Sequence, residues 1–351
     1  MSPEAGLSSP RVRTPATLEK YLLNTTADPS AITNEPPFFE VQVVHKTRVA
    51  KDIWRFDLQH ADASPLPPFT AGSHLTVQVP GGARRNYSLC SDPADIGTYQ
   101  IAVKRDAQGR GGSVAMADGV NEGDRLMISA PRNNFELHPR AADSLFIAGG
   151  IGITPILSMM RQLKHQGHPF KLIYCTRDPE NTAFLEELSA PEFAAQVRLH
   201  HDQGDIGNAL DLWPLFEKPG NAHVYCCGPR GLMDAVADMS GHWPNGAIHF
   251  ESFGVDASAF AANTAFTVHL QKAGIDLPVA AGQSILEALR VHGVQVPSSC
   301  ESGTCGSCRT GLLGGAAEHR DMVLSDGEKE SQSQIMVCIS RATSPQLVLD
   351  L

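Results

Sequence analysis

Four cysteines near the carboxyl end of the chain have a spacing that suits an iron–sulfur cluster. Cys300, Cys305 and Cys308 share the stretch Cys-Glu-Ser-Gly-Thr-Cys-Gly-Ser-Cys, and Cys338 follows much later. A C-x4-C-x2-C motif with one distant cysteine is the plant-type pattern for a [2Fe–2S] cluster held by four thiolates. A structural zinc site is the alternative, but zinc sites usually show paired C-x2–4-C units. The spacing therefore favours the cluster and one-electron chemistry.

Two stretches in the first half of the chain have the composition of a flavin site. Arg85-Asn86-Tyr87-Ser88 combines a cation for a phosphate with a ring and a hydroxyl for an isoalloxazine. Gly109-Arg110-Gly111-Gly112-Ser113 then leads into a predicted short helix, whose free N–H groups suit an anion. Each motif is weak alone, and the second could be a flexible surface loop. Together they favour a flavin phosphate site.

Two turns in the middle of the chain fit a nicotinamide nucleotide. Gly149-Gly150-Ile151-Gly152-Ile153-Thr154-Pro155 follows one predicted strand, and Cys227-Gly228-Pro229 follows another. The carboxyl ends of parallel strands share one crevice, so both turns should face the same ligand. A G-x-G turn alone is weak evidence, and the second turn strengthens it.

The residues after the next predicted strand bear on which nucleotide binds. Arg177 and Asp178 stand where the adenosine ribose usually lies. An acidic residue there repels a 2′-phosphate, so we expect NADH rather than NADPH, although Arg177 weakens that expectation.

Histidines in this region are weak metal candidates. His200 and His201 are adjacent on a predicted strand, so their side chains should point to opposite faces. His242 and His249 have no partner at ligand spacing.

Period-two hydrophobicity organises the first part of the chain. Short strands are predicted over 39–44, 53–58, 75–79, 86–89, 99–104 and 125–129, with turn residues between them. This spacing predicts an antiparallel Greek-key β-barrel over residues 38–139. It would carry both candidate flavin stretches.

Strands and helices alternate in the next part, which predicts an α/β domain with a parallel sheet over residues 140–254. Strands are expected over 144–148, 171–176, 196–200, 223–227 and 247–251, and one of the helices over 209–216. Residues 255–264 read as a linker. Residues 265–351 predict a small mixed sheet crossed by a helix over 284–291, with Cys338 on a strand, as in a β-grasp ferredoxin domain.

Composition and charge exclude several classes of protein. The chain has 351 residues and a net charge of −10, which argues against a nucleic-acid binder. Residues 1–37 read as an N-terminal extension with neither a signal peptide nor a membrane span. Eight cysteines without a secretory signal point to a reducing cytoplasm, and Cys90, Cys175, Cys226 and Cys227 are by default core residues.

In motifs and domain order the chain resembles the phthalate dioxygenase reductase family from about Phe38 to Leu351. The strings that carry the likeness are Arg84 to Cys90, Val103 to Ser113, Ala148 to Pro155, Val224 to Pro229, His249 to Phe253 and Pro297 to Cys308. The commoner Thr of the family is replaced by Asn86, a conservative change, and the family gives the extension no role.

The resemblance implies an FMN barrel, an NAD domain and a ferredoxin domain, in that order, and it assigns residues to each. The FMN residues are Arg85, Asn86, Tyr87, Ser88, Val103, Lys104, Gly111, Gly112, Ser113 and Phe253, which matches the aromatic that stacks on the isoalloxazine. The NAD residues are Gly149, Gly150, Gly152, Thr154, Pro155, Arg177, Asp178, Cys227, Gly228 and Pro229. Ser88, Cys227 and Phe253 would lie closest to the reacting rings.

The expected function is electron transfer from NADH, through FMN and the cluster, to a Rieske-type terminal oxygenase. Plant-type clusters lie near about −400 mV and Rieske centres at roughly −150 to +300 mV. A gap of about 250 mV, at ~59 mV per decade, favours that acceptor by roughly four powers of ten. We expect a monomer that docks only transiently.

Other functions share most of these features. The chain could be an FAD-containing reductase of another multicomponent hydroxylase, or the reductase of a vanillate-type O-demethylase. An iron–sulfur redox sensor without turnover is a third possibility, which the complete nicotinamide site disfavours. The sequence names neither the oxygenase nor its aromatic substrate.

Overall fold

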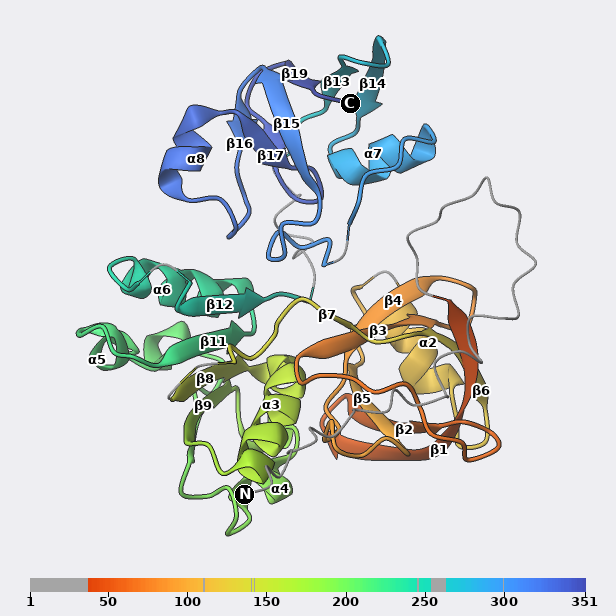
Figure 1. The fold of residues 1–351 in the computed structure, drawn as a ribbon, viewed down its shortest axis with the longest axis vertical. Coiled ribbons are helices and arrows are strands. Elements are labelled where there is room, and N and C mark those ends of the chain that lie inside the picture. The colour runs from red at the N-terminus through yellow and green to blue at the C-terminus, as the bar shows by residue number, and fades with distance from the viewer. Residues whose placement is uncertain are drawn as a thin grey trace, which may run out of the picture. The chain divides into compact units, whose positions relative to one another are not determined.

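The computed structural model describes residues 37–351 apart from Arg110, Arg140, Ala142, Asn245, 254–262 and Ser299, and these described residues belong to one unit of the fold. Most of the predicted extension over 1–37 and of the predicted linker over 255–264 therefore lies outside the described residues. Figure 1 draws the first set of strands in red to orange, the parallel sheet in green and the last domain in blue.

The first set of strands forms an antiparallel barrel, as predicted. Its elements are β1 (Phe38–Ala50), β2 (Ile53–Gln59), β3 (Ser73–Gln78), β4 (Arg84–Ser88), β5 (Tyr99–Lys104), α2 (Gly112–Gly119), β6 (Arg125–Ser129) and β7 (Arg132–Asn133). The strand order is β4-β3-β6-β1-β2-β5, and a bridge between Leu89 and Ile101 joins the two outer strands. Because β3 lies beside β6 rather than β2, the topology is a Greek key.

The second set forms a parallel sheet with helices on both faces. Its strands are β8 (Ser144–Gly149), β9 (Phe170–Thr176), β10 (Val197–His201), β11 (His223–Cys227) and β12 (Ile248–Glu251), in the order β10-β9-β8-β11-β12. The helices are α3 (Ile153–Gln166), α4 (Leu185–Ser189), α5 (Trp213–Phe216) and α6 (Arg230–Ser240). The strand order reverses between β8 and β11, which is where such sheets bind ligands.

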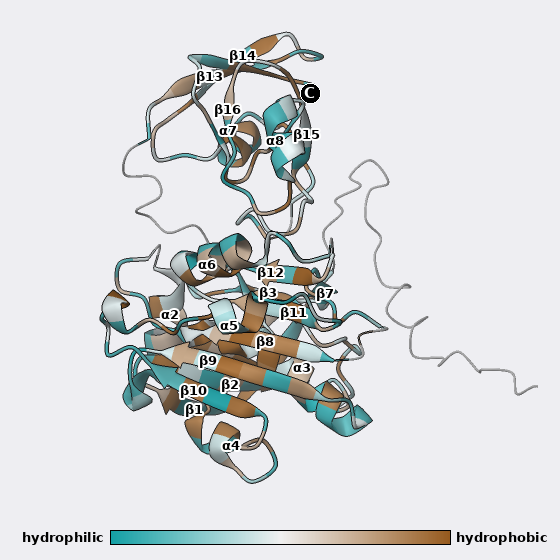
Figure 2. Ribbon diagram, turned by 90° about the vertical axis from the view of Figure 1, so that its left-hand side faces the viewer, coloured by the Kyte–Doolittle hydropathy of each residue, from teal (hydrophilic) through white to brown (hydrophobic). Residues whose placement is uncertain are grey.

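Alternate residues of these strands are buried in two different cores. Phe146, Tyr225 and Cys227 pack on the α3 side, in a core that continues into the barrel. Ile147 and Cys226 pack on the other side, with residues of α5 and α6. The brown stretches on β8 and β9 show that these strands are largely hydrophobic (Figure 2), as expected for parallel strands buried on both faces.

The last domain is a mixed sheet with the β-grasp arrangement, as predicted. The strands β13 (Phe266–Leu270), β14 (Ile275–Val279), β15 (Arg309–Gly314), β17 (Gln334–Met336) and β19 (Gln346–Leu349) are ordered β14-β13-β19-β15-β17. A second pair joins β16 (Ala317–Glu318) to β18 (Arg341–Ala342), and the helices are α7 (Ile285–Val291) and α8 (Asp326–Ser331). A capping box of Ser284 and Glu287 begins α7.

Three predicted elements have clearly different limits in the structure. The strand expected over 39–44 continues as far as Ala50 in β1. The helix expected over 209–216 is only α5, because the Asp211 carboxylate accepts the Trp213 N–H and Pro214 can only begin a helix. The strand expected around Cys338 ends at Met336, whose carbonyl accepts the N–H groups of Ile339 and Ser340 in a turn. The apolar side chains around Cys338 are buried as expected, but the backbone there is not extended.

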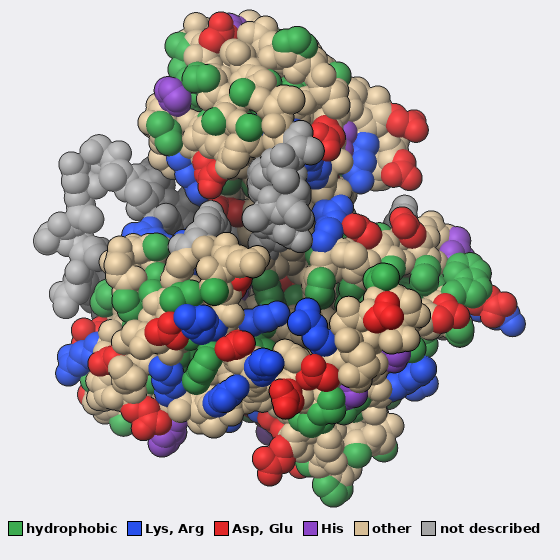
Figure 3. Space-filling model, turned by 180° about the vertical axis from the view of Figure 1, so that it is seen from behind, with side chains coloured by type: hydrophobic (Ala, Val, Ile, Leu, Met, Phe, Trp, Pro, Cys, Tyr) green, Lys and Arg blue, Asp and Glu red, His purple; other side chains and the backbone are tan. Residues whose placement is uncertain are grey.

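No helix among the described residues is long and apolar enough to cross a bilayer. On the face drawn in Figure 3, exposed hydrophobic side chains lie scattered among charged ones.

Candidate functional site

The four predicted cluster ligands come together in two pairs. A hydrogen bond from the Cys305 thiol lowers the pKa of Cys300, and one from the Cys338 thiol lowers the pKa of Cys308. The backbone N–H groups of Ser302 and Thr304 each lie 3.4 Å from Cys300 Sγ. Main-chain donors of this kind stabilise thiolates.

The pairing of the thiols fits a binuclear cluster better than a single ion. Among the residues that the structure describes, no group of three or more His, Cys, Asp or Glu side chains could hold one metal ion. A zinc ion would need four ligands around one point. In a [2Fe–2S] cluster four cysteines are shared between two irons, so two thiols at each end suffice.

Strand β4 and the N-terminus of α2 bring the predicted flavin residues together. A Cβ placed on Gly112 would lie 2.7 Å from Arg85 Nε, so the glycine lets the Arg85 side chain lie close against the start of the helix. Gly111, with φ 79°, precedes the helix in the left-handed conformation that favours glycine. The Ser113 hydroxyl accepts the Asp106 N–H at 3.1 Å and closes the turn. The Arg85 guanidinium and the N–H groups at the start of α2 thus lie side by side, an arrangement that fits the terminal phosphate of a flavin nucleotide.

The remaining barrel residues differ in what they can offer a flavin. Tyr87 is half-buried, and burial raises its pKa to about 12, so it stays a neutral phenol. The Asn86 side-chain oxygen accepts the Thr76 hydroxyl at 2.8 Å. Val103 is buried in the barrel core, so only its main chain can contact a ligand, whereas Lys104 is exposed.

The two predicted nucleotide turns lie against each other at the reversal of strand order. A Cβ on Gly152 would meet the Cys227 carbonyl oxygen at 2.1 Å, and one on Gly149 would meet Pro229 Cδ at 2.5 Å. Gly150 adopts φ 53°, and its carbonyl accepts the Tyr174 hydroxyl at 2.9 Å. Glycines at these positions let the two backbones touch, as a site for a pyrophosphate requires.

The other predicted nucleotide residues lie at the start of α3 and after β9. Thr154 and Pro155 are buried in the first turn of α3, where the Thr154 hydroxyl donates to the Ile151 carbonyl at 3.1 Å. The Asp178 carboxylate accepts the backbone N–H and side-chain amide of Asn181, and these hydrogen bonds lower its pKa. Arg177 lies beside Gly204.

A buried carboxyl group that was not predicted as a site residue joins the two half-sites. Glu251 is the register partner of Cys227 on the neighbouring strand, and its Oε2 accepts the Ser88 hydroxyl at 3.3 Å. Burial raises the pKa of Glu251 to about 8 and raises that of the Cys227 thiol well above its usual range. Near neutral pH both side chains are therefore mostly protonated. The position of this acidic residue at the end of an apolar strand is the sequence signal that could have indicated Glu251 as a site residue.

Phe253 lies two residues beyond this carboxyl group. Its side chain is 47% exposed, so it is not a core residue. An exposed aromatic ring next to a buried polar cluster can cover a flat ligand.

His249 has a histidine neighbour that its spacing in the sequence did not indicate. His249 Nε2 lies 2.9 Å from His223 Nδ1, and the ring of His138 stacks on His223 with a centroid separation of 4.0 Å. Burial lowers the pKa of His249 to about 4, so this imidazole is neutral near pH 7. These residues are far apart in sequence, and parallel pairing of β11 with β12 brings two of them together.

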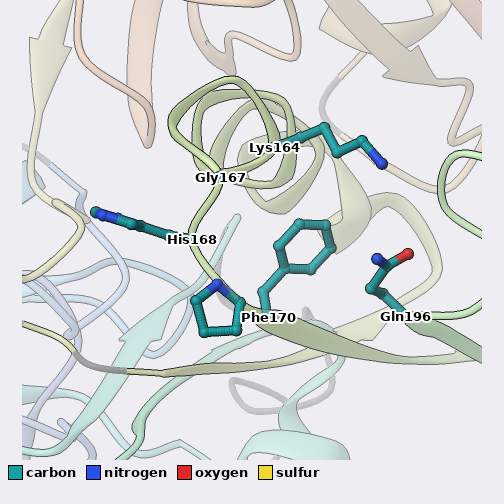
Figure 4. A pocket seen from close by; sticks show the side chains of 6 residues that line it. Lys164, Gly167, His168, Phe170 and Gln196 are labelled. Carbon is teal, nitrogen blue, oxygen red and sulfur yellow. The ribbon is translucent and has the colours of Figure 1, made fainter.

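A surface cavity of about 410 Å³ lies away from these residues. Lys164, Phe170 and Gln196 line it, at the end of α3 and the start of β9 (Figure 4). It faces the amino ends of the strands, whereas the nucleotide turns follow the carboxyl ends.

Family models match each of the three parts of the chain. The oxidoreductase FAD-binding domain matches residues 40–137, the oxidoreductase NAD-binding domain matches 146–238, and the 2Fe-2S iron–sulfur cluster binding domain matches 268–343.

Individual proteins match the chain over most of its length. The phthalate 4,5-dioxygenase oxygenase reductase subunit of Pseudomonas putida is 58% identical, over 90% of this chain and 97% of its own. The vanillate O-demethylase oxidoreductase of a Pseudomonas species is 40% identical, over 89% and 99%. The solved structure of a phthalate dioxygenase reductase, described as modular for electron transfer from pyridine nucleotides to [2Fe–2S], is 54% identical. It has a TM-score of 0.72 and covers 90% of this chain and 98% of its own.

Proposed function

Because this chain belongs to the phthalate dioxygenase reductase family, we propose that it passes electrons from NADH to the Rieske-type terminal oxygenase of an aromatic-ring dioxygenase. Bound flavin would accept hydride and the [2Fe–2S] cluster would carry single electrons onward, which is chemistry that the cofactors supply. The protein binds these groups, orients them and keeps water away from them.

One contact carries the proposal. The hydrogen bond from Ser88 to Glu251 links the strand of the candidate flavin site to the strand beside Cys227. Hydride transfer requires a nicotinamide and a flavin face to face in a dry place. The Ser88, Cys227 and Glu251 side chains are buried where the barrel and the parallel sheet meet, which supports hydride transfer at this place.

The flavin is FMN in this proposal. Arg85, Gly111, Gly112 and Ser113 would hold its terminal phosphate, and Asn86, Tyr87, Ser88, Phe253 and the main chain near Val103 and Lys104 would surround its rings. The close approach of Gly112 to Arg85 supports a compact phosphate site. Acid release of the flavin followed by chromatography should give FMN, and an FAD peak would contradict the assignment.

NADH would bind where the two glycine turns meet. Gly149, Gly150, Gly152, Thr154 and Pro155 would shape one side, with Cys227, Gly228 and Pro229 on the other. Arg177 and Asp178 follow β9, where the adenosine ribose is expected. The Asp178 carboxylate already accepts two groups from Asn181, so it would act mainly as a fixed negative charge against a 2′-phosphate.

The cluster would be held by Cys300 and Cys305 on one iron and by Cys308 and Cys338 on the other. The two thiol pairs support this division. The domain limits proposed are 1–37, 38–139, 140–254, 255–264 for the linker and 265–351. The matched ranges of the family models lie inside them. We also propose a cytoplasmic monomer that meets its oxygenase transiently.

A vanillate-type O-demethylase is the second candidate partner, since a reductase of that kind is 40% identical. Both partners need the same reductase chemistry, so the first test concerns the reductase alone. NADH added anaerobically should bleach the flavin, then the cluster, and then drive cytochrome c reduction. A protein that does not oxidise NADH would support the sensor alternative.

A further inference from the structure

One buried serine joins the cluster loop to the neighbouring domain. Ser302 is 3% exposed, and its hydroxyl donates to the Ser252 carbonyl at 2.9 Å. Its own N–H lies 3.4 Å from Cys300 Sγ. A single residue thus contacts both a candidate cluster ligand and the end of β12.

The acceptor of this bond lies in the candidate flavin site. Ser252 stands between Glu251, which contacts Ser88, and Phe253, the exposed aromatic ring proposed to cover the flavin. A path of contacts therefore leads from Cys300 at the candidate cluster to Phe253 at the candidate flavin site. It consists of the hydrogen bond from the Ser302 N–H to the Cys300 sulfur and the one from the Ser302 hydroxyl to the Ser252 carbonyl in the neighbouring domain.

The cluster loop is held against its own domain by close contacts. A hydrogen bond from Ser302 to another domain therefore positions the whole loop. Gly303 has φ 81°, and a Cβ there would lie 2.7 Å from Ile339 Cγ2 and 3.2 Å from Asp321 Cα. The Gly303 carbonyl accepts the Met322 N–H at 2.9 Å. Nearby, Arg230 of α6 donates to the Arg320 carbonyl at 2.9 Å, which fixes the same segment to the parallel-sheet domain.

We propose that Ser302 is a positioning residue for electron transfer between the flavin and the cluster, acting through its hydrogen bond to the Ser252 carbonyl. This inference rests on the proposed function. Ser302 holds Cys300 at a fixed separation from the flavin face, and transfer between two fixed centres falls steeply as their separation grows. The main partner of the hydroxyl is the Ser252 carbonyl, and its interaction with the Cys300 thiol is the weakest of those around that sulfur, so its loss should change the cluster itself little.

The test is Ser302→Ala in the full-length, cofactor-loaded protein, with Ser298→Ala as the matched control. Within the part of the chain that the structure describes, the hydrogen bonds of the Ser298 hydroxyl join it to Arg290 and Glu301 of its own domain. Anaerobic stopped-flow absorbance separates the reduction of flavin by NADH from the later reduction of the cluster. An EPR-monitored titration gives the midpoint potential of the cluster.

In Ser302→Ala we expect an unchanged rate of flavin reduction, an unchanged cluster potential and a slower internal transfer, by about tenfold or more, as for small misplacements of reacting groups. Ser298→Ala should match the wild type in all three, and Ser302→Thr should recover part of the internal rate. The internal rate constant does not depend on the loaded fraction, so partial cluster loss leaves it measurable.

Two results would overturn the proposal. An internal rate equal to that of the wild type would show that the hydroxyl does not position the centres. A shifted cluster potential accompanying the slow rate would show that Ser302 acts on the cluster instead. Failure of wild-type protein to reduce its flavin with NADH would refute the proposed function, and the inference with it.

Discussion

At the scale of single residues, the candidate site depends on groups whose protonation is set by burial or by main-chain donors. Thiols of the cluster loop receive N–H groups, whereas Cys227 and Glu251 lie in a place that water does not reach. The two environments suit opposite tasks, because the first favours thiolates that bind metal and the second favours neutral groups beside a hydride.

Cys305→Ser should separate the two halves of the reaction. The change removes one of the two thiols of a pair, so the cluster should be lost or impaired, while Ser88, Glu251 and Cys227 remain in place. NADH should still reduce the flavin at close to the wild-type rate. Cytochrome c reduction should fall by about two orders of magnitude or more, as when one of several groups that act together is removed. Equal losses in both rates would contradict the separation of the sites.

Glu251→Gln should change how stability depends on pH. The folded-state pKa of about 8 lies above the ordinary value of 4.5, so between these values the folded protein keeps a proton that the unfolded chain has lost. Stability should therefore fall as pH rises from about 5 to 8, by on the order of 4 kcal/mol. The glutamine variant should lose this slope in thermal unfolding of the loaded protein. Parallel curves for the two proteins would show that Glu251 ionises normally.

At the scale of elements, the candidate nucleotide site is a contact between two turns. Pairing of β11 with β8 places Cys227 opposite Ala148, so the residues after each strand lie next to each other. Gly149 and Gly152 are required by this contact rather than by flexibility, since a Cβ on either would lie 2.5 Å or less from an atom of the facing turn.

Gly152→Ala should impair both folding and NADH binding. The added Cβ would overlap the Cys227 carbonyl, so the turns must separate, at a cost of about 1–3 kcal/mol. We expect a raised KM for NADH and a lower unfolding midpoint in urea. Gly327→Ala in α8 is the control, because nothing lies within 4 Å of its Cβ. A wild-type KM and midpoint in Gly152→Ala would mean that the turns are not in contact.

Most elements could be predicted from the sequence because their signals are local. Alternating hydrophobicity marked the barrel strands, and glycine turns after buried strands marked the nucleotide site. The extent of α5 and the turn at Cys338 depended on competing hydrogen bonds from Asp211 and to Met336, which periodicity does not encode. The contacts of Glu251, His249 and Ser302 join segments distant in sequence, so only the fold could bring them together.

At the scale of the whole molecule, the barrel and the parallel sheet share one core and a polar link. Arg161 of α3 donates to the Cys90 carbonyl at 2.6 Å and to Gln100 Oε1 at 2.9 Å, both in the barrel, and pairs with Glu187. Holding these two domains together keeps Ser88 next to Glu251, on which the proposed hydride step depends.

Arg161→Leu should therefore destabilise the protein and loosen the flavin site. The change leaves the largely buried Glu187 and Cys90 carbonyl without their partner, a cost of about 2–3 kcal/mol. Urea denaturation followed by flavin fluorescence should show the loss. Arg125→Leu, which removes an exposed pair with Glu40, should change stability by less than about 0.5 kcal/mol. Equal effects of the two changes would argue against a domain-linking role for Arg161.

The central claim is that electrons from NADH leave this protein for a Rieske-type oxygenase. Purified protein should be mixed with NADH and, in separate reactions, with Rieske oxygenases acting on phthalate, terephthalate and vanillate. The account predicts oxidised aromatic product in proportion to NADH consumed with at least one oxygenase, phthalate being the first expectation, and none with Cys305→Ser. NADH consumption without product from any of the three would contradict it.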